Sequence, residues 1–216
     1  MSSYQHVIFD FDGTLFDSRI GIVNSVKYAL DEMEISHPSE EVLTSFIGPP
    51  LHYSFQKHIG LSQKDTEHAV LKLREHYSDE GHLQSKPYEG LFEIVKELFK
   101  QDRKIGIATA KPTVYTKHIL DNNQWTSYFH CVYGSDLKGE LFPKEKTIAQ
   151  VLKDFRHPDP DTCVMIGDTI YDIKGAHQQG IPSIAVDYGY GKTQDLKDAR
   201  PKHFVENVEQ LRELIL

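Results

Sequence analysis

Short apolar segments rich in β-branched residues recur along the chain, and each ends in small or acidic residues. Such segments predict buried β-strands. Between them the apolar positions have helical spacing: Leu91, Ile94, Val95, Leu98 and Phe99 follow the pattern of one buried helix face. This alternation predicts an α/β fold, a parallel sheet with helices on both faces. The expected strands are 6–10, 104–109, 130–134, 162–168, 182–187 and 203–206.

One long region interrupts the alternation. From about Ser18 to about Leu83 the sequence shows helical patterns and no strand pattern. Ser39 and Ser62 are expected N-caps within it, and Gly60 is expected to end a helix. We therefore predict two domains, a core of residues 1–16 and 84–216 and a helical insertion of residues 17–83.

Composition narrows the functional classes. With 216 residues, 39% hydrophobic and 26% charged, the chain has an ordinary globular composition. Its net charge of −8 disfavours binding to nucleic acid or anionic membranes, so an anionic substrate would need a local binding feature. No secretory signal pattern and no apolar run of about 18 residues is present, which favours a cytoplasmic protein. Cys131 and Cys163 lie in apolar stretches and are expected to be free buried thiols.

Acidic and hydroxyl residues follow several of the predicted strands. The segment "HVIFDFDGTLFDS" places Asp10 and Asp12 at the end of the first strand, and positions i and i+2 of an extended chain point the same way. Thr109 ends a second strand, and Asp168 ends another, with Asp172 four residues later. Ligands of open α/β sheets bind at the carboxyl ends of strands, so we expect these side chains to form one site.

The chemistry of such a site follows from its charges. Carboxylates brought this close repel one another unless a cation neutralises them, and Mg²⁺ suits oxygen ligands. With a metal present, Asp10 can act as a nucleophile that forms an aspartyl-phosphate, while Asp12 carries the proton for the leaving group. Asp17 is expected to be a hinge or helix-cap residue rather than a third member of the site.

A phosphoryl group also needs hydrogen-bond donors. The segment "IATAKP" offers Thr109 and the backbone amide of Ala110, with Pro112 as the expected first residue of a helix whose N-terminus faces an anion. Lys144 follows Pro143 at another helix start and could contact both the phosphate and Asp10. Lys111 is a weaker candidate for substrate binding.

Each of these features has a simpler structural explanation when taken alone. "DGT" is a common turn, Thr109 could cap a helix, and Lys144 could be a solvated surface charge. Asp168 could be an N-cap, with Asp172 facing solvent. The segment "GYGKT" at 189–193 lacks the spacing of a phosphate loop and is interpreted as a loop. The occurrence of four pieces in one order, each at a strand end or helix start, favours the functional interpretation.

The segments "DFDGTLFDS", "ATAKP" and "GDTIYD", together with Lys144, resemble the four motifs of the haloacid dehalogenase superfamily of phosphohydrolases. The resemblance covers essentially the whole chain and implies a Rossmann-like core with the helical cap of subfamily I. "SFIGPPLHYSF" and "IATAKP" further resemble the phosphoglycolate phosphatase-like and 5'-nucleotidase-like branch. The resemblance implies that Asp10 is the nucleophile, Asp12 the general acid and base, Thr109 a phosphate ligand and Lys144 an orienting charge. It also implies a Mg²⁺ site formed by Asp10, the backbone carbonyl of Asp12, and Asp168, with Asp172 nearby.

We therefore expect a Mg²⁺-dependent phosphatase that hydrolyses small phosphomonoesters such as phosphoglycolate or nucleoside monophosphates. The expected partner is a small phosphorylated metabolite, without nucleic acid or membrane, and the chain is expected to be a monomer or homodimer. A sugar-phosphate mutase shares every core motif and stays open as an alternative, as does a phospho-aspartate signalling switch. In the insertion, the candidates for substrate contact are Arg74, Tyr77, Gly48, Pro49 and Pro50.

Overall fold

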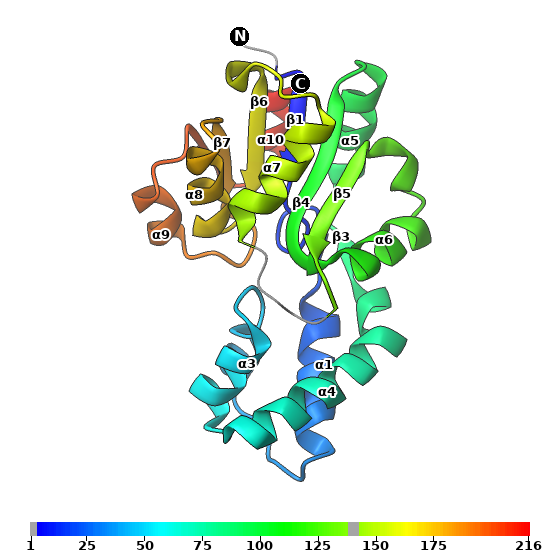
Figure 1. Cartoon of the computed structure of the whole chain (residues 1–216), viewed down its shortest axis with the longest axis vertical. Coiled ribbons are helices and arrows are strands. Elements are labelled where there is room, and N and C mark those ends of the chain that lie inside the picture. Colours follow the sequence, from blue (N-terminus) through cyan, green and yellow to red (C-terminus); the bar gives the residue numbers. More distant parts are fainter. Residues whose placement is uncertain (1–3, 138–142) are drawn as a thin grey trace. The chain divides into compact units, whose positions relative to one another are not determined.

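The computed structural model describes residues 4–137 and 143–216. In that part of the chain, six strands form one parallel sheet in the order β5-β4-β1-β6-β7-β8 (Figure 1). Each of the six corresponds to a predicted strand, so the expected α/β fold is confirmed. The strands are β1 (His6–Phe9), β4 (Lys104–Pro112), β5 (Cys131–Ser135), β6 (Cys163–Gly167), β7 (Ser183–Val186) and β8 (His203–Val205).

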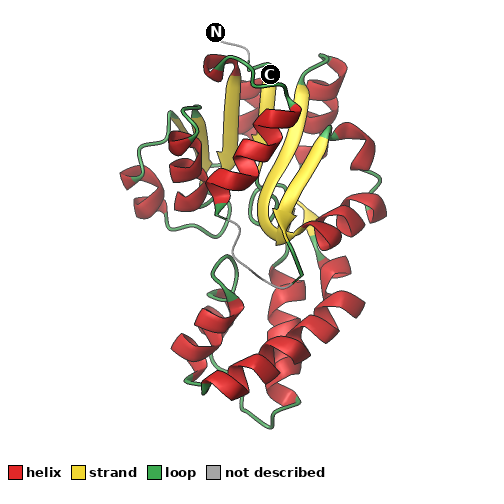
Figure 2. Ribbon diagram, viewed as in Figure 1, coloured by secondary structure: helices red, strands yellow, loops and turns green. Residues whose placement is uncertain are grey.

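Helices cover both faces of this sheet (Figure 2). On β1, Val7 and Phe9 pack into one apolar cluster with side chains of α5, α6 and α10. Ile8, which points the opposite way, packs into a second cluster with side chains of α7 and α8. The period of two along a strand therefore divides its apolar residues between two helical layers. The helices of the core are α5 (Leu91–Lys100), α6 (Thr113–Asn122), α7 (Lys144–Asp154), α8 (Ile170–Gln178), α9 (Thr193–Asp198) and α10 (Val208–Ile215).

The buried face of α5 is narrower than the sequence pattern predicts. Leu91, Ile94, Val95 and Leu98 are fully buried, but Phe99 is 43% exposed. A helix turns by about 100° per residue, so position i+8 lies about 80° away from Leu91 around the axis. The Phe99 ring instead packs edge-on against Tyr128, with the ring centroids 5.3 Å apart.

The insertion folds as a separate helical unit of residues 18–86, while 4–17 and 87–216 belong to the core unit. The predicted bounds were 17–83. Two short strands, β2 (Phe16–Asp17) and β3 (Lys86–Pro87), pair with each other near the ends of the insertion. Ser39 and Ser62 cap helices as expected, accepting hydrogen bonds from the amides of Val42 and Asp65. The unit contains α1 (Arg19–Asp31), α2 (Glu40–Thr44), α3 (Leu51–Ser54), a π-helical turn (Phe55–Ile59), α4 (Gln63–Asp79) and a 3₁₀ turn (Gly81–Gln84).

Across residues 4–137 and 143–216, none of the helices has the length and apolar character needed to cross a membrane.

Candidate active site

The candidate site lies at the carboxyl end of β1, which is the strand between β4 and β6. The chain runs outward from β4 to β5 on one side of β1 and from β6 to β7 and β8 on the other, so the winding direction reverses here. Such a reversal is where open α/β sheets bind ligands. Asp10 directly follows β1, and its backbone amide donates to the carbonyl of Ile166 in β6 over 2.8 Å. The main chain therefore holds Asp10 against the end of the neighbouring strand.

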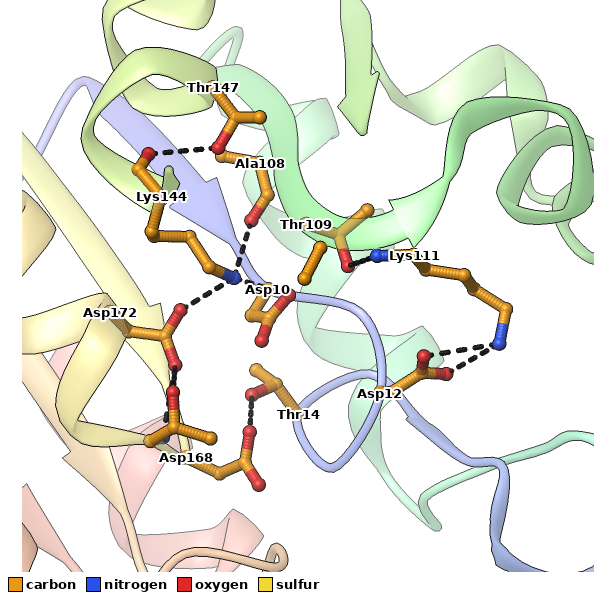
Figure 3. A network of polar contacts seen from close by, with 12 residues as sticks. Asp10, Asp12, Thr14, Ala108, Thr109, Lys111, Lys144, Thr147, Asp168 and Asp172 are labelled. Carbon is orange, nitrogen blue, oxygen red and sulfur yellow. Dashed lines mark hydrogen bonds and ion pairs between the residues drawn. The ribbon is translucent and has the colours of Figure 1, made fainter. Parts of the chain in front are cut away.

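Three buried carboxyl groups meet at this point (Figure 3). Among the described residues, Asp10, Asp168 and Asp172 place carboxylate oxygens within 4.8 Å of one another. Asp172 is in the first turn of α8, and its Oδ2 accepts hydrogen bonds from the amide and hydroxyl of Thr169 at 2.9 and 2.7 Å. The N-cap position is thus Thr169 rather than Asp168, and Asp172 is buried rather than facing solvent.

Lys144, the first residue of α7, brings positive charge into this cluster. Its ammonium lies 2.8 Å from Asp10 Oδ1 and 2.7 Å from Asp172 Oδ1, and it also donates to the carbonyl of Ala108 over 3.1 Å. The side chain is buried, so the simpler interpretation as a solvated surface lysine is wrong. Both oxygens of Asp172 are engaged, by Lys144 and by Thr169. This makes Asp172 better suited to holding Lys144 than to binding a metal directly.

The charges in the cluster do not balance. Burial raises the pKa of Asp10 to about 6, with repulsion from Asp172 adding to the rise and Lys144 opposing it. Burial and the neighbouring charges of Asp10 and Asp172 raise the pKa of Asp168 to about 8. Burial alone would lower the pKa of Lys144, but the attraction of Asp10 and Asp172 outweighs it and the pKa is raised. The site therefore favours an additional cation.

Asp12 is not part of this cluster. Its carboxylate points to the opposite side of the β1 loop, where the ammonium of Lys111 donates to Oδ1 over 2.9 Å and to Oδ2 over 3.1 Å (Figure 3). Lys111 is in the last part of β4, and its backbone amide donates to the hydroxyl of Thr109 over 3.2 Å. Thr109 is buried between the two groups of charges.

Two contacts that support Asp168 were not predicted from the sequence. The amide of Tyr190 donates to Asp168 Oδ2 over 2.8 Å, and the hydroxyl of Thr14 donates to Oδ1 over 3.2 Å. Gly189 is required here, because a Cβ at this position would lie 2.3 Å from the Asp168 Cβ. Of the predicted loop 189–193, residues 189–192 are a loop and Thr193 begins α9, and this loop holds an acidic residue of the site. Its position after β7, at the carboxyl edge of the sheet, was the available signal.

Two further expectations concern the segment after Thr109. Ala110 is exposed and lies where the register of β4 against β5 shifts. Pro112 is not the first residue of a helix: its backbone is extended, with φ −55° and ψ 131°, it ends β4, and α6 begins at Thr113.

Asp17 is in β2, and its carboxylate accepts a hydrogen bond from the hydroxyl of Tyr190.

The candidates for substrate contact in the insertion lie on helix α4 and in the loop before α3. Arg74 and Tyr77 are both on α4, where Arg74 is half-buried and Tyr77 is buried with its ring 6.2 Å from that of His82. Gly48 has a φ of +98°, a backbone conformation that favours glycine, and precedes Pro49 and Pro50. Contact of these residues with a substrate stays a prediction.

Residues 7–186 match the family of haloacid dehalogenase-like hydrolases. The chain belongs to this family. It is 33% identical over 212 residues to a 5'-nucleotidase of Pseudomonas aeruginosa, covering 98% of this chain and 96% of that one. A crystal structure from Clostridium difficile is 39% identical, covers all of both chains and has a TM-score of 0.95.

A third relative has a different name. The tyrosine-protein kinase PtkA of Mycobacterium tuberculosis is 30% identical over 215 residues, which are 99% of this chain and 73% of that protein. Relatives of similar identity therefore carry names for different reactions. The family and its hydrolase fold are confirmed, and the choice of substrate has to be argued from the site.

Proposed function

We propose that this protein is a Mg²⁺-dependent phosphatase that hydrolyses small phosphomonoesters through an aspartyl-phosphate on Asp10. The observation that supports it most strongly is the buried ion pair between Lys144 and Asp10 inside a cluster of carboxyl groups. In this pair the ammonium of Lys144 lies 2.8 Å from Oδ1 of Asp10, where it can orient the nucleophile.

The donor set fits Mg²⁺. Hard divalent cations prefer oxygen ligands, and Asp10 and Asp168 supply two carboxyl groups. Burial and the repulsion of neighbouring carboxylates raise the pKa of both groups. Asp10, Asp168 and the backbone carbonyl of Asp12 would hold the ion, and Asp172 would hold Lys144. When bound, the ion would place positive charge beside the phosphoryl oxygens.

The reaction then uses this chain's own groups in two steps. Asp10 attacks phosphorus, the ester P–O bond breaks, and Asp12 gives its proton to the departing oxygen. Water next attacks the phosphorus of the aspartyl-phosphate, its proton passes to Asp12, and inorganic phosphate leaves with Asp10 restored. Thr109 and the amide of Ala110 would donate hydrogen bonds to the phosphoryl oxygens.

Small anionic metabolites suit this site better than macromolecules. The net charge of −8 opposes nucleic acid and anionic membranes, whereas the cation and the donors would capture a phosphate locally. A nucleoside monophosphate is the first substrate to test, since a relative over nearly the full length is named a 5'-nucleotidase. Phosphoglycolate is the second, and we propose that the chain acts as a monomer or homodimer.

The test is a phosphate-release assay on p-nitrophenyl phosphate, nucleoside monophosphates and phosphoglycolate, with MgCl₂ or with EDTA. We expect release that requires Mg²⁺ and falls to background in Asp10→Asn. Asp161→Asn, the same change at an exposed position of the core, should keep wild-type activity. Activity retained in Asp10→Asn or in EDTA contradicts the mechanism. Transfer of the phosphoryl group to a sugar phosphate instead of water would identify a mutase.

A further inference from the structure

The ion pair between Lys111 and Asp12 joins the end of β4 to the loop after β1. The two residues are 99 positions apart, and sequence alone indicates Lys111 only as a weak candidate for substrate binding. The ammonium donates to both oxygens of the Asp12 carboxylate, at 2.9 and 3.1 Å. Because both oxygens face the same ammonium, these bonds fix the direction in which the carboxylate points.

Burial distinguishes the two partners. The Lys111 side chain is 3% exposed and the Asp12 side chain is 20% exposed. The Lys111 ammonium lies over the Phe11 ring, 5.8 Å from the ring centroid, and the Lys111 backbone amide donates to the hydroxyl of Thr109. Lys111 is therefore the fixed partner, and the more open carboxylate of Asp12 is the one that can face a substrate.

We propose that Lys111 is a positioning residue, which orients Asp12 for proton transfer to the leaving group and stabilises the carboxylate that forms when the proton has left. This inference rests on the proposed function. The ester oxygen accepts the proton as its bond to phosphorus breaks, and Asp12 becomes the anion that faces the ammonium. A fixed positive group is most effective where charge develops during the reaction.

If Lys111 acts through Asp12, its removal should affect esters with poor leaving groups most. If Lys111 only bound the phosphate, its removal should affect all esters equally. Phenyl phosphate and p-nitrophenyl phosphate have nearly the same shape, but the phenolate is the poorer leaving group and needs the proton more. For Lys111→Met, we expect kcat/KM to fall about tenfold more for phenyl phosphate than for p-nitrophenyl phosphate. This factor is smaller than the full contribution of a general acid, because Asp12 itself is still present. Inhibition by inorganic phosphate should be unchanged, and Lys111→Arg should restore part of the loss.

Two controls complete the experiment, which is run with MgCl₂. Lys117→Met, at an exposed position of α6, should behave as wild type on both esters. In an Asp12→Asn background, Lys111→Met should change kcat/KM by less than about twofold, because its effect passes through Asp12. Circular dichroism on each variant checks that it is folded. Lys111→Met leaves Asp12 partly exposed and able to be hydrated, so it is the milder way to break the pair.

Several outcomes overturn the proposal. An equal loss on both esters, weaker inhibition by inorganic phosphate, or full additivity with Asp12→Asn would show that Lys111 binds the phosphate itself or supports the fold. If the wild-type protein releases phosphate from neither aryl ester, nor from nucleoside monophosphates or phosphoglycolate, the proposed function fails and this inference fails with it. An active wild type with a uniform loss in Lys111→Met contradicts the inference alone.

Discussion

The two lysines near the carboxyl end of β1 have contrasting surroundings. Lys144 lies among Asp10 and Asp172, with Asp168 nearby, in a buried cluster with an excess of negative charge. Lys111 donates to both oxygens of the Asp12 carboxylate, which is partly open to solvent. The first arrangement calls for a further cation, whereas the second places one ammonium against one carboxylate. In the proposed mechanism, the loop after β1 thus separates the group that would bind the metal from the group that would transfer the proton.

The largest effect should come from removing the charge of Lys144. Lys144→Met leaves buried carboxyl groups without their cation, and breaking a buried ion pair in this way costs about 3–5 kcal/mol in the free energy of unfolding. Urea denaturation in EDTA measures it. Lys153→Met, exposed on the same helix, should be neutral.

A partial rescue would sharpen the comparison. Adding Asp172→Asn to Lys144→Met removes one of the carboxylates left without a partner, and the double variant should regain stability. Lys111→Met should be less destabilising than Lys144→Met because Asp12 can be hydrated. Equal losses for the two lysines would contradict the contrast between the regions.

An intermediate effect should appear in the pH dependence of the metal-free protein. The pKa values of about 6 for Asp10 and about 8 for Asp168 lie above the ordinary value of 3.8. The folded state therefore binds more protons than the unfolded state in that interval, and its stability should fall as pH rises from about 4 to about 8. Mg²⁺ at 100 times its dissociation constant should add about 2.7 kcal/mol, with affinity rising over the same interval. Thermal melts in EDTA and in MgCl₂ measure both changes.

Variants on each side of the loop serve as controls for this prediction. Asp168→Asn should flatten its share of the pH dependence and lose the stabilisation by Mg²⁺. Asp12→Asn should keep that stabilisation, because its side chain is turned toward Lys111. Subtracting the pH dependence of stability of Asp168→Asn from that of the wild type removes the contributions of the histidines, which both proteins share. If Mg²⁺ stabilises Asp168→Asn as much as wild type, the assigned metal site is wrong.

The smallest effect should come from Thr14→Val. This change removes the hydroxyl that donates to Asp168 Oδ1 and keeps the shape of the side chain. We expect a loss of about 1 kcal/mol in the free energy of unfolding, together with weaker binding of Mg²⁺ because Asp168 is less well oriented. Calorimetric titration with MgCl₂ measures the binding. Thr193→Val, at an exposed position, should change neither quantity.

Much of the fold could be predicted because its signals are local. A strand such as Ile105–Thr109 is apolar and β-branched over a few residues, and the helical spacing of Leu91 to Leu98 repeats within three turns. Phe99 and Pro112 show the limit of local patterns. The exposure of Phe99 depends on how α5 rotates against the sheet, and the extension of β4 to Pro112 depends on pairing with β5.

The sequence alone predicted which residues would gather at the candidate site. Asp10, Thr109, Lys144 and Asp168 each stand at a strand end or helix start, and in a parallel sheet such positions meet at one edge. Only the tertiary structure decided how their charges are divided. The pairing of Lys111 with Asp12, of Lys144 with Asp10 and Asp172, and of Tyr190 with Asp168 joins residues far apart in the chain. These pairings depend on the order of the strands in the sheet and on the direction of each side chain. Neither can be predicted from a short stretch of sequence.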